Sequence, residues 1–239
     1  VTVESAIQRH FAIYNNNLDA IVVPSRFFME KFVEWGWAPE KFAYIPNYVD
    51  AAAFTPHYQP GDYFLYFGRL APEKGIVTLL RAVAQSGVRL KVAGTGPLDA
   101  ELRQLQAELG ADVEFLGYRS GAELHQLIQQ SRAVVLPSEW YENAPMSVLE
   151  SFALGKPVLG ARIGGIPEMV LPGQTGWVFT SGDAAELADR LAEVQALPDT
   201  AVAQLGQQAR QFVTETFNRQ RYVDATLALY SRLGVKNDG

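Results

Sequence analysis

Short apolar runs alternate with amphipathic stretches along the chain from Tyr63 onward. The apolar runs lie at 63–67, 90–93, 113–116, 133–136, 157–159 and 176–179. Between them, apolar residues recur every three or four positions, as at Leu98, Leu102, Leu105 and Leu109, which is typical of amphipathic helices. Brief apolar runs joined by helices indicate a parallel sheet that is covered on both faces. The pattern therefore predicts an α/β domain in which helices flank a parallel sheet with right-handed crossovers.

The first part of the chain has a different pattern. Strands are predicted at 20–23 and 42–45, on either side of a helix at 27–35 that Ser25 caps, and a further helix is predicted at 4–14. These few elements can cover too little apolar surface to form a domain by themselves. They therefore predict a partial second domain at the N-terminus.

Prolines mark the boundary between the two parts. Pro46, Pro56 and Pro60, together with Gly61, are typical of a connecting segment. The predicted parts are 1–47, the partial domain; 48–62, the connection; and 63–239, the main domain. Helices of the main domain are expected at 77–85, 98–109, 123–131, from Met146, near Pro167, and at 184–194, 199–214 and 218–233.

Composition excludes several classes of function. The net charge of −6 argues against a general affinity for nucleic acid or anionic membranes, because such affinity needs a basic surface. The absence of cysteine excludes disulfides, thiolate metal sites and a thiol nucleophile. No apolar run approaches the roughly 18–20 residues of a transmembrane helix. The 48% of hydrophobic and 19% of charged residues are typical of a soluble globular protein.

Two glutamates, Glu142 and Glu150, flank a predicted helix start. Pro145 lies between them and suits a first helical turn, because the N–H group that proline lacks would be unpaired there anyway. A helix start offers free N–H groups and the positive end of a dipole to an anion. An anion site with a carboxylate on either side suits a nucleotide-diphosphate sugar, whose ribose and sugar hydroxyls can donate to the two acids. A solvated helix face would explain the same pair without a ligand.

Cations lie at the end of the first main strand. Gly68 and Arg69 follow this strand, at the edge where ligands of open α/β sheets bind. Gly68 permits close backbone approach, Arg69 can hold a phosphate through two hydrogen bonds, and Lys74 adds a point charge. Ordinary solvated loop cations would have the same pattern.

No cluster of Asp and His has the spacing of a metal site, so no metal is expected. The histidines are interpreted as structural or surface residues: His10, His57 and His125.

Taken together, these motifs resemble those of the retaining glycosyltransferases of family four. The resemblance rests on 68–75, 142–150, 155–158 and 164–168, which occur in the family's order and spacing. It extends from about Asp19 to the C-terminus. It implies the two-domain GT-B fold, with this chain as the Rossmann-like C-terminal domain that binds the nucleotide sugar, plus the tail of the N-terminal acceptor domain.

The resemblance also implies roles for individual residues. Arg69 and Lys74 would hold the donor diphosphate and offset the charge of the leaving group without a metal. Glu142 would contact the donor sugar, and Glu150 would hold the ribose diol. The predicted catalytic residues are therefore Arg69, Lys74 and Glu142.

The loop between the two acids departs from the family's common Gly-Phe-Gly sequence. This chain has Asn143-Ala144-Pro145 there, as in an Asn-x-Pro version that some members carry. Because Pro145 has no N–H group, Ala144, Met146 and Ser147 are left to reach the phosphates. The next turn, 164–168, also resembles the family.

Two further loops complete the predicted donor site. Gly94 and Gly96 would lie at the nucleotide rim, and Tyr118 and Arg119 would lie near the base. A tight turn into a helix capped by Thr95, and a plain exposed loop, would explain these positions without a ligand. The predicted donor-binding residues are Gly68, Gly94, Gly96, Tyr118, Arg119, Asn143, Ala144, Met146, Ser147 and Glu150.

The resemblance predicts a retaining hexosyltransferase that uses a nucleotide sugar such as a UDP- or GDP-hexose and needs no cofactor. The expected partner is the missing N-terminal acceptor domain, or a chain that supplies it. The expected location is the cytoplasm, with peripheral membrane contact in the full enzyme. Two alternatives are a donor-binding module without turnover and a nucleotide-sugar epimerase, which the loop at 143–145 does not favour. Residual transfer by the chain distinguishes the first alternative, and product identity the second.

Overall fold

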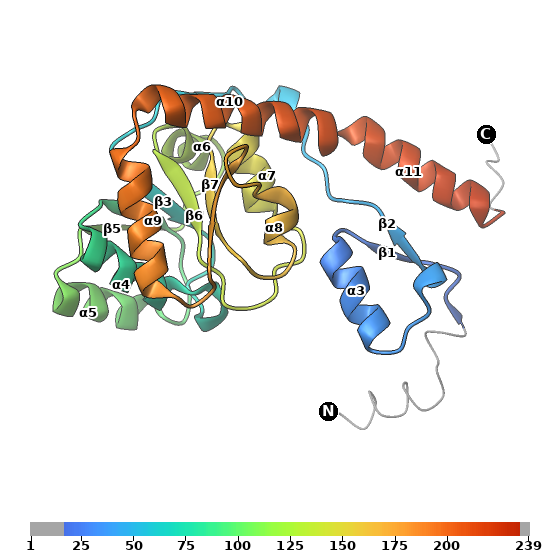
Figure 1. Ribbon diagram of the computed structural model, residues 1–239, viewed down its shortest axis with the longest axis horizontal. Helices are drawn as coiled ribbons and strands as arrows, with labels where there is room; N and C mark the ends of the chain where they lie inside the picture. The colour runs from blue at the N-terminus through green and yellow to red at the C-terminus, as the bar shows by residue number, and fades with distance from the viewer. Residues whose placement is uncertain (1–16, 235–239) are drawn as a thin grey trace.

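A six-stranded parallel sheet forms the centre of the main domain (Figure 1). The computed structural model describes residues 17–234. The strands of this sheet are β3 (Phe64–Phe67), β4 (Leu90–Ala93), β5 (Val113–Gly117), β6 (Ala133–Leu136), β7 (Val158–Ala161) and β8 (Gly176–Phe179). Their spatial order is β5-β4-β3-β6-β7-β8, and every neighbouring pair is parallel. The predicted α/β fold with a parallel sheet is confirmed.

Helices cover both faces of the sheet. One face carries α4 (Ile76–Ser86), α5 (Asp99–Leu109) and α9 (Ala184–Ala196), whose buried side chains form one core cluster with the strands. The other face carries α6 (Gly121–Gln129), α7 (Met146–Ala153), α8 (Ile166–Met169) and α10 (Asp199–Thr216), which form a second cluster. Phe64 and Tyr66 of β3 belong to the first cluster and Leu65 to the second, because successive strand side chains point to opposite faces.

The chain leaves the sheet in opposite directions after β3 and after β6. The connection from β3 leads to β4 on one side, whereas the connection from β6 leads to β7 on the other side. Where strand order reverses in this way, the loops diverge and leave a crevice at the carboxyl edge of the sheet. Gly68 directly follows β3 and the 137–145 loop follows β6. The crevice therefore lies between the predicted motif at 68–75 and the predicted motif at 142–150.

A smaller unit precedes the main sheet. In this unit β1 (Ile21–Val23) pairs in parallel with β2 (Phe42–Tyr44), and α3 (Arg26–Glu34) links the two strands. The Oγ atom of Ser25 accepts from the N–H group of Phe28 at 3.2 Å, so the predicted N-cap of α3 is confirmed. The ring centroid of Phe32 lies 5.6 Å from that of Trp35 and 5.6 Å from that of Trp37. The helix predicted at 4–14 lies outside the described residues.

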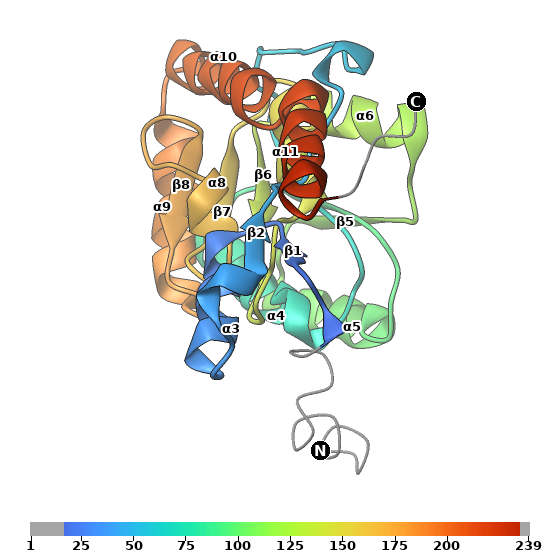
Figure 2. The ribbon, with the colours of Figure 1, turned by 90° about the vertical axis from the view of Figure 1, so that its right-hand side faces the viewer.

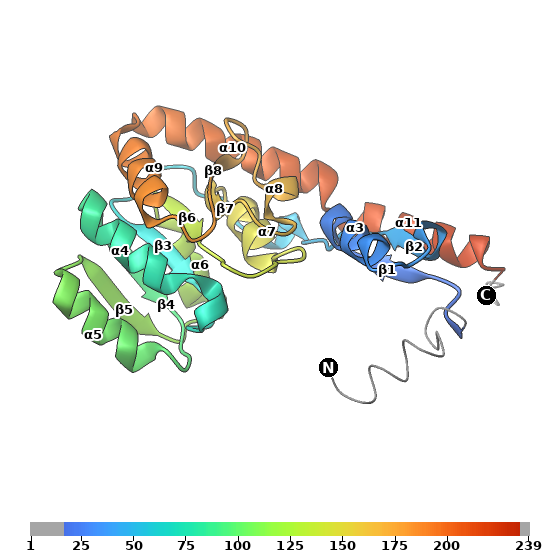
Figure 3. The same ribbon diagram turned by 60° about the horizontal axis from the view of Figure 1, so that its bottom comes forward.

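The smaller unit contacts the main domain and the last helix. The carboxylate of Glu168 accepts from the N–H groups of Arg26 and Phe27 at 3.0 and 2.7 Å. Helix α11 (Arg219–Arg232) runs back beside the β1–β2 pair (Figures 2 and 3), and the rings of Tyr48 and Tyr222 lie 4.9 Å apart. The predicted boundary at 48–62, which includes a short 3₁₀ turn at Ala51–Ala53, stays a prediction. Within residues 17–234, no helix combines the length and the apolar content that a bilayer crossing requires.

A buried lysine fastens the connecting segment to the main domain. Lys156 lies between α7 and β7 with 1% of its surface exposed, and its Nζ atom donates to the carbonyl oxygen of Gln59 at 2.7 Å. Burial disfavours the ammonium form and lowers the pKa of Lys156 from 10.5 to about 8.

We expect Lys156→Met to change the pH dependence of stability. Because the pKa of Lys156 is lower in the folded state, the unfolded chain binds more protons between the folded-state pKa of about 8 and the ordinary value of 10.5. The wild-type free energy of unfolding should therefore rise with pH in that window, relative to the variant, by on the order of 3 kcal/mol. Denaturant titrations across this pH range measure the difference.

Lys41→Met is the matched control, because the Nζ atom of Lys41 also donates to a backbone carbonyl, that of Leu18 at 2.7 Å, but at the exposed surface. Its free energy of unfolding, measured over the same pH range, is the reference for the loss of a lysine hydrogen bond at the surface. Equal slopes for the two variants would contradict the role assigned to burial.

Candidate functional site

The loops that follow β3 and β4 are joined by backbone hydrogen bonds. The N–H group of Gly68 donates to Ala93 at 3.0 Å, and that of Leu70 donates to Thr95 at 2.9 Å. A Cβ atom added to Gly94 would lie 1.8 Å from the carbonyl oxygen of Gly68, and one added to Gly96 would lie 2.2 Å from that of Leu70. Glycine at both positions therefore allows the loop after β4 to pack closely against the loop after β3 and to hold it in place.

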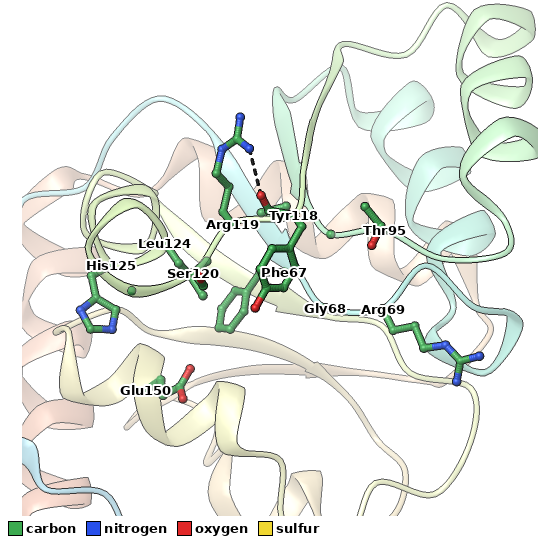
Figure 4. Close-up of a pocket in the computed structure, with 13 residues that line it drawn as sticks. Phe67, Gly68, Arg69, Thr95, Tyr118, Arg119, Ser120, Leu124, His125 and Glu150 are labelled. Atoms are coloured by element: carbon green, nitrogen blue, oxygen red, sulfur yellow. Dashed lines mark hydrogen bonds between the residues drawn. The ribbon is translucent and has the colours of Figure 1, made fainter.

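A cleft of about 540 Å³ opens at this edge of the sheet (Figure 4). Its walls come from the ends of β3 and β4, from the β5–α6 loop and the start of α6, and from α7. The lining residues are Phe67, Gly68, Arg69, Ala93, Gly94, Thr95, Tyr118, Arg119, Ser120, Gly121, Leu124, His125 and Glu150. The cleft thus brings together predicted residues from four separate segments: Gly68, Arg69, Gly94, Tyr118, Arg119 and Glu150.

The two ends of the cleft differ in charge. Glu150 and His125 lie at one end and Arg69 at the other, with Tyr118 and Phe67 between them (Figure 4). Burial raises the pKa of the Glu150 carboxyl above its usual value, while the nearby His125 opposes this shift. His125, which the sequence led us to interpret as a structural or surface residue, and Phe67, which was predicted only as part of a strand, also line the cleft. The only sequence signal for a place of His125 in the cleft is its position in the helix that follows β5.

Arg69 and the residues of the β5–α6 loop are exposed. The side chain of Arg69 is 68% exposed and its Nη1 atom lies 3.9 Å from the Oε1 atom of Glu73. Tyr118 is 70% exposed, and the Nη1 atom of Arg119 donates to its carbonyl oxygen at 2.9 Å. These groups can therefore adjust to a ligand at little cost in lost packing.

An ion pair joins two of the predicted catalytic residues. The Nζ atom of Lys74, in a 3₁₀ turn at Pro72–Lys74, lies 2.6 Å from the Oε1 atom of Glu142. The hydroxyl of Ser138 donates to the same carboxylate oxygen at 2.8 Å. Both partners are largely buried, with 30% and 17% of their side chains exposed. The charge of Lys74 is therefore already matched when no anion is bound.

The segment between the two acids contacts the smaller unit. The Oδ1 atom of Asn143 accepts from the hydroxyl of Ser25 at 2.5 Å, and the carbonyl oxygen of Ala144 accepts from the Nδ2 atom of Asn47 at 3.0 Å. Helix α7 begins at Met146, which is 41% exposed. Asn143, Ala144, Met146 and Ser147 surround this helix start beside the cleft. Their contact with a donor, like that of Gly96, stays a prediction.

Two local predictions need correction. Pro145 was expected in the first helical turn, but it is the N-cap residue of α7 with extended backbone angles. Thr95 was expected to cap α5, but the N-cap of that helix is Leu98. The backbone of Thr95 is instead bonded to Leu70, which places it in the wall of the cleft.

Among residues 17–234, no group of three or more carboxylate or imidazole side chains could hold a metal ion. Arg69 and Glu150 line the cleft, whereas the Lys74–Glu142 ion pair and the start of α7 lie outside its lining, on the segments that follow β3 and β6. This arrangement can bind an anion together with hydroxyl groups.

Comparison with known proteins identifies the family. The sequence profile of the group 1 glycosyl transferases matches residues 51–212, which is more than half of the chain. The chain therefore belongs to the group 1 glycosyl transferase family.

Relatives and solved structures agree with this assignment. A glycogen synthase of Mycobacterium tuberculosis is 32% identical over 231 residues, which cover 89% of this chain and 54% of the relative. A D-inositol 3-phosphate glycosyltransferase of Mycolicibacterium paratuberculosis is 36% identical over 179 residues, which cover 72% of this chain and 40% of the relative. The chain spans about half the length of the curated relatives it matches.

The crystal structure of Anabaena Alr3699/HepE in complex with UDP has a similar fold. Its TM-score is 0.84 at 23% identity, and the match covers 98% of this chain and 69% of that one. The likeness confirms the GT-B fold class.

We expect Gly164→Ala to displace the loop that carries Glu142. Gly164 has a φ of +60°, and an added Cβ atom would lie 2.2 Å from the carbonyl oxygen of Glu142. The substitution should lower the free energy of unfolding by about 1–3 kcal/mol more than backbone strain alone. Denaturant titration measures this loss.

Gly110→Ala isolates the strain, because Gly110 has a φ of +64° and its added Cβ atom would meet no heavy atom within 4 Å in the described part of the chain. It should cost about 1–2 kcal/mol. If both variants lost the same stability, the close approach to Glu142 would not matter.

Proposed function

We propose that this chain carries the nucleotide-sugar-binding half of a retaining glycosyltransferase, which moves a hexosyl group from a nucleoside diphosphate to an acceptor hydroxyl. The observation that carries the proposal is the cleft at the reversal of strand order, with Arg69 at one end and Glu150 at the other. A cation and a half-buried carboxylate at opposite ends suit a nucleotide, which offers a diphosphate at one end and a ribose diol further along.

We assign the diphosphate to Arg69, Lys74 and the start of α7. Arg69 can form two parallel hydrogen bonds to phosphate oxygens. The first N–H groups of α7, from Met146 and Ser147, have no partner within the helix and attract anions. Lys74 would exchange part of its contact with Glu142 for the phosphate, which frees Glu142 to accept from hydroxyls of the donor sugar.

We assign the ribose and the base to the opposite end of the cleft. The Glu150 carboxylate can accept from both ribose hydroxyls, and a hydrogen bond to a charged group is stronger than one between neutral groups. The base would lie against Tyr118 and Phe67, with Arg119 and the backbone of the β5–α6 loop beside it. A UDP- or GDP-hexose is the donor class that we propose. The UDP complex of HepE supports a uridine nucleotide.

Transfer with retention needs no protein nucleophile if the acceptor attacks from the side on which the diphosphate leaves. The bond from the anomeric carbon to the diphosphate oxygen breaks while the bond to the acceptor oxygen forms. The acceptor's proton passes to the departing phosphate oxygen. The protein then has to stabilise negative charge on the diphosphate, which preorganised cations and N–H groups do well in a partly dry site. We assign this task to Arg69, Lys74 and the start of α7, without a metal.

A second candidate is a donor-binding module that does not turn over by itself. It is favoured by one observation: the chain spans about half the length of its curated relatives. An N-terminal acceptor domain or a partner chain would then supply the acceptor site. Nucleotide binding is common to both candidates, so titration with UDP, GDP and ADP tests them together. Hydrolysis or transfer of the hexose from a UDP- or GDP-hexose separates them.

We expect Arg69→Ala to weaken diphosphate binding selectively. Loss of a hydrogen bond between charged groups should cost about 1.5–3 kcal/mol in UDP or GDP affinity. The affinity for uridine or guanosine, which lack phosphate, should change little. Isothermal titration or ligand-detected NMR measures both.

Arg190→Ala is the matched control, because Arg190 is also an exposed arginine beside a carboxylate, Glu193, but lies on α9 away from the cleft. It should leave both affinities unchanged. Equal losses of nucleoside and diphosphate affinity in Arg69→Ala would mean that Arg69 does not address the phosphates.

We expect the two glutamates to respond differently to replacement by glutamine. Glu150→Gln should weaken uridine and UDP by about 1–3 kcal/mol, because the ribose diol loses a charged acceptor. Glu142→Gln should leave UDP unchanged and weaken only UDP-glucose. If Glu142→Gln damaged UDP binding equally, the assignment of the two acids would be wrong.

The raised pKa of Glu150 adds a test with a defined sign. Protonation removes the charged acceptor, so uridine affinity should fall as the pH decreases through the pKa of Glu150, before ordinary exposed glutamates are protonated. Uridine has no phosphate whose own protonation would interfere. The variant Glu150→Gln should show no such fall, and an identical fall in the variant would assign the effect to another group.

A further inference from the structure

Two large aromatic side chains are exposed beside the proposed donor site. Trp140 and Tyr141 lie in the β6–α7 loop directly before Glu142, with 69% and 52% of their surfaces exposed. Their ring centroids lie 6.0 Å apart. Rings this exposed add little to the hydrophobic stability of the fold. Adjacent exposed aromatic rings instead indicate a contact surface.

The backbone that carries these rings is held on both sides. Before the pair, the N–H group of Glu139 donates to Glu73 at 2.9 Å, and the carboxylate of Glu139 accepts from the hydroxyl of Thr78 at 2.6 Å. After the pair, the carbonyl oxygen of Glu142 accepts from the N–H group of Gly165 at 2.7 Å. A surface that is already ordered loses less conformational entropy when a ligand binds.

The pair faces the smaller unit. The ring of Tyr141 lies 4.9 Å from that of Phe27 on α3, and the Nζ atom of Lys31 lies 5.9 Å from the Tyr141 centroid. The pair therefore lies between Glu142, which we assign to the donor sugar, and α3, which we assign to the acceptor domain. An acceptor hydroxyl has to reach the anomeric carbon through this region.

We propose that Trp140 and Tyr141 form a platform for a pyranose ring of the acceptor, and that the acceptor is therefore a glycoside. This inference rests on the proposed function. A pyranose presents a face of C–H groups, which stack on the electron-rich face of an aromatic ring. Its hydroxyls point outward from the ring, where the Lys31 ammonium, which contacts the Glu34 carboxylate at 2.7 Å, has further N–H groups to donate to them.

Charge next to the platform argues against an anionic surface as the ligand. Glu139 and Glu142 flank the two rings in the chain, and the whole chain has a net charge of −6. The ammonium groups of Lys31 and Lys74 are already paired with Glu34 and Glu142, so they offer an anionic membrane or an acidic acceptor little net attraction, whereas a neutral sugar needs none.

Saturation-transfer NMR on the 239-residue chain tests the platform. The probes are the methyl glycosides of glucose, galactose, mannose and N-acetylglucosamine, with sorbitol as an open-chain polyol control. UDP or GDP, whichever binds more tightly, is added in excess, and the measurement is repeated without nucleotide. We expect transfer from the protein to the ring C–H groups of at least one glycoside and none to sorbitol.

Three variants locate the signal. Trp140→Ala should weaken glycoside binding roughly tenfold, as expected for the loss of one stacked ring, whereas Trp140→Phe should retain part of the signal. Trp35→Ala is the matched control, because Trp35 is also exposed, at 56%, but packs against Phe32 on the smaller unit. It should behave as wild type. All three should bind the nucleotide as wild type does.

Several results would overturn the platform. One is an absence of transfer to every glycoside in the wild type, and another is equal transfer in Trp140→Ala and the wild type. A third is loss of transfer in Glu142→Gln but not in Trp140→Ala, because that result would assign the signal to the donor-sugar pocket. A change in self-association of Trp140→Ala without any change in sugar binding would mean that the rings contact protein instead. Failure of the wild type to bind any nucleotide would reject the proposed function separately, because the glycoside measurement without nucleotide still reports on the platform.

Discussion

The reversal of strand order between β3 and β6 is the constraint on which the site depends. Because the chain turns to opposite sides after these two neighbouring strands, the loops that carry Arg69 and Glu142 begin close together and then diverge. A crevice at this edge follows from topology alone. What topology does not supply is rigidity, which comes from the close packing of the 94–96 turn against 68–70. Arg69, to which we assign the phosphate, thus lies on a loop whose backbone is already bonded to its neighbour.

The ion pair between Lys74 and Glu142 joins the two diverging loops across the crevice. Its value for stability is small, because desolvation of two largely buried charges offsets much of their attraction. Under the proposed function its value for binding is larger. The pair keeps a cation and a carboxylate in fixed positions without a ligand, so a diphosphate sugar would only have to redistribute bonds that already exist. Preorganisation of this kind is what an electrostatic mechanism requires.

The helices and strands could be predicted from the sequence because the spacing of apolar residues follows directly from which side chains of an element are buried. Strands such as Leu90–Ala93 and Ala133–Leu136 match their predicted bounds, since a buried parallel strand is a continuous apolar run. The long-range pairs could not be predicted in this way. Lys74 and Glu142 are 68 positions apart, and no local pattern indicates that their side chains meet. The place of His125 in the cleft could not be predicted for the same reason, because it depends on which face of α6 packs on the sheet.

One serine links the smaller unit to the donor loop, and this contact has a mechanical consequence. The hydroxyl of Ser25 accepts from the first turn of α3 and donates to Asn143, so the same atom caps a helix and holds the segment between the two proposed donor acids. Glu168 strengthens the contact by accepting from the first N–H groups of the same helix, where a negative charge is favoured by the dipole. Any displacement of α3 therefore acts directly on Asn143, and through it on the start of α7 at which we place the diphosphate.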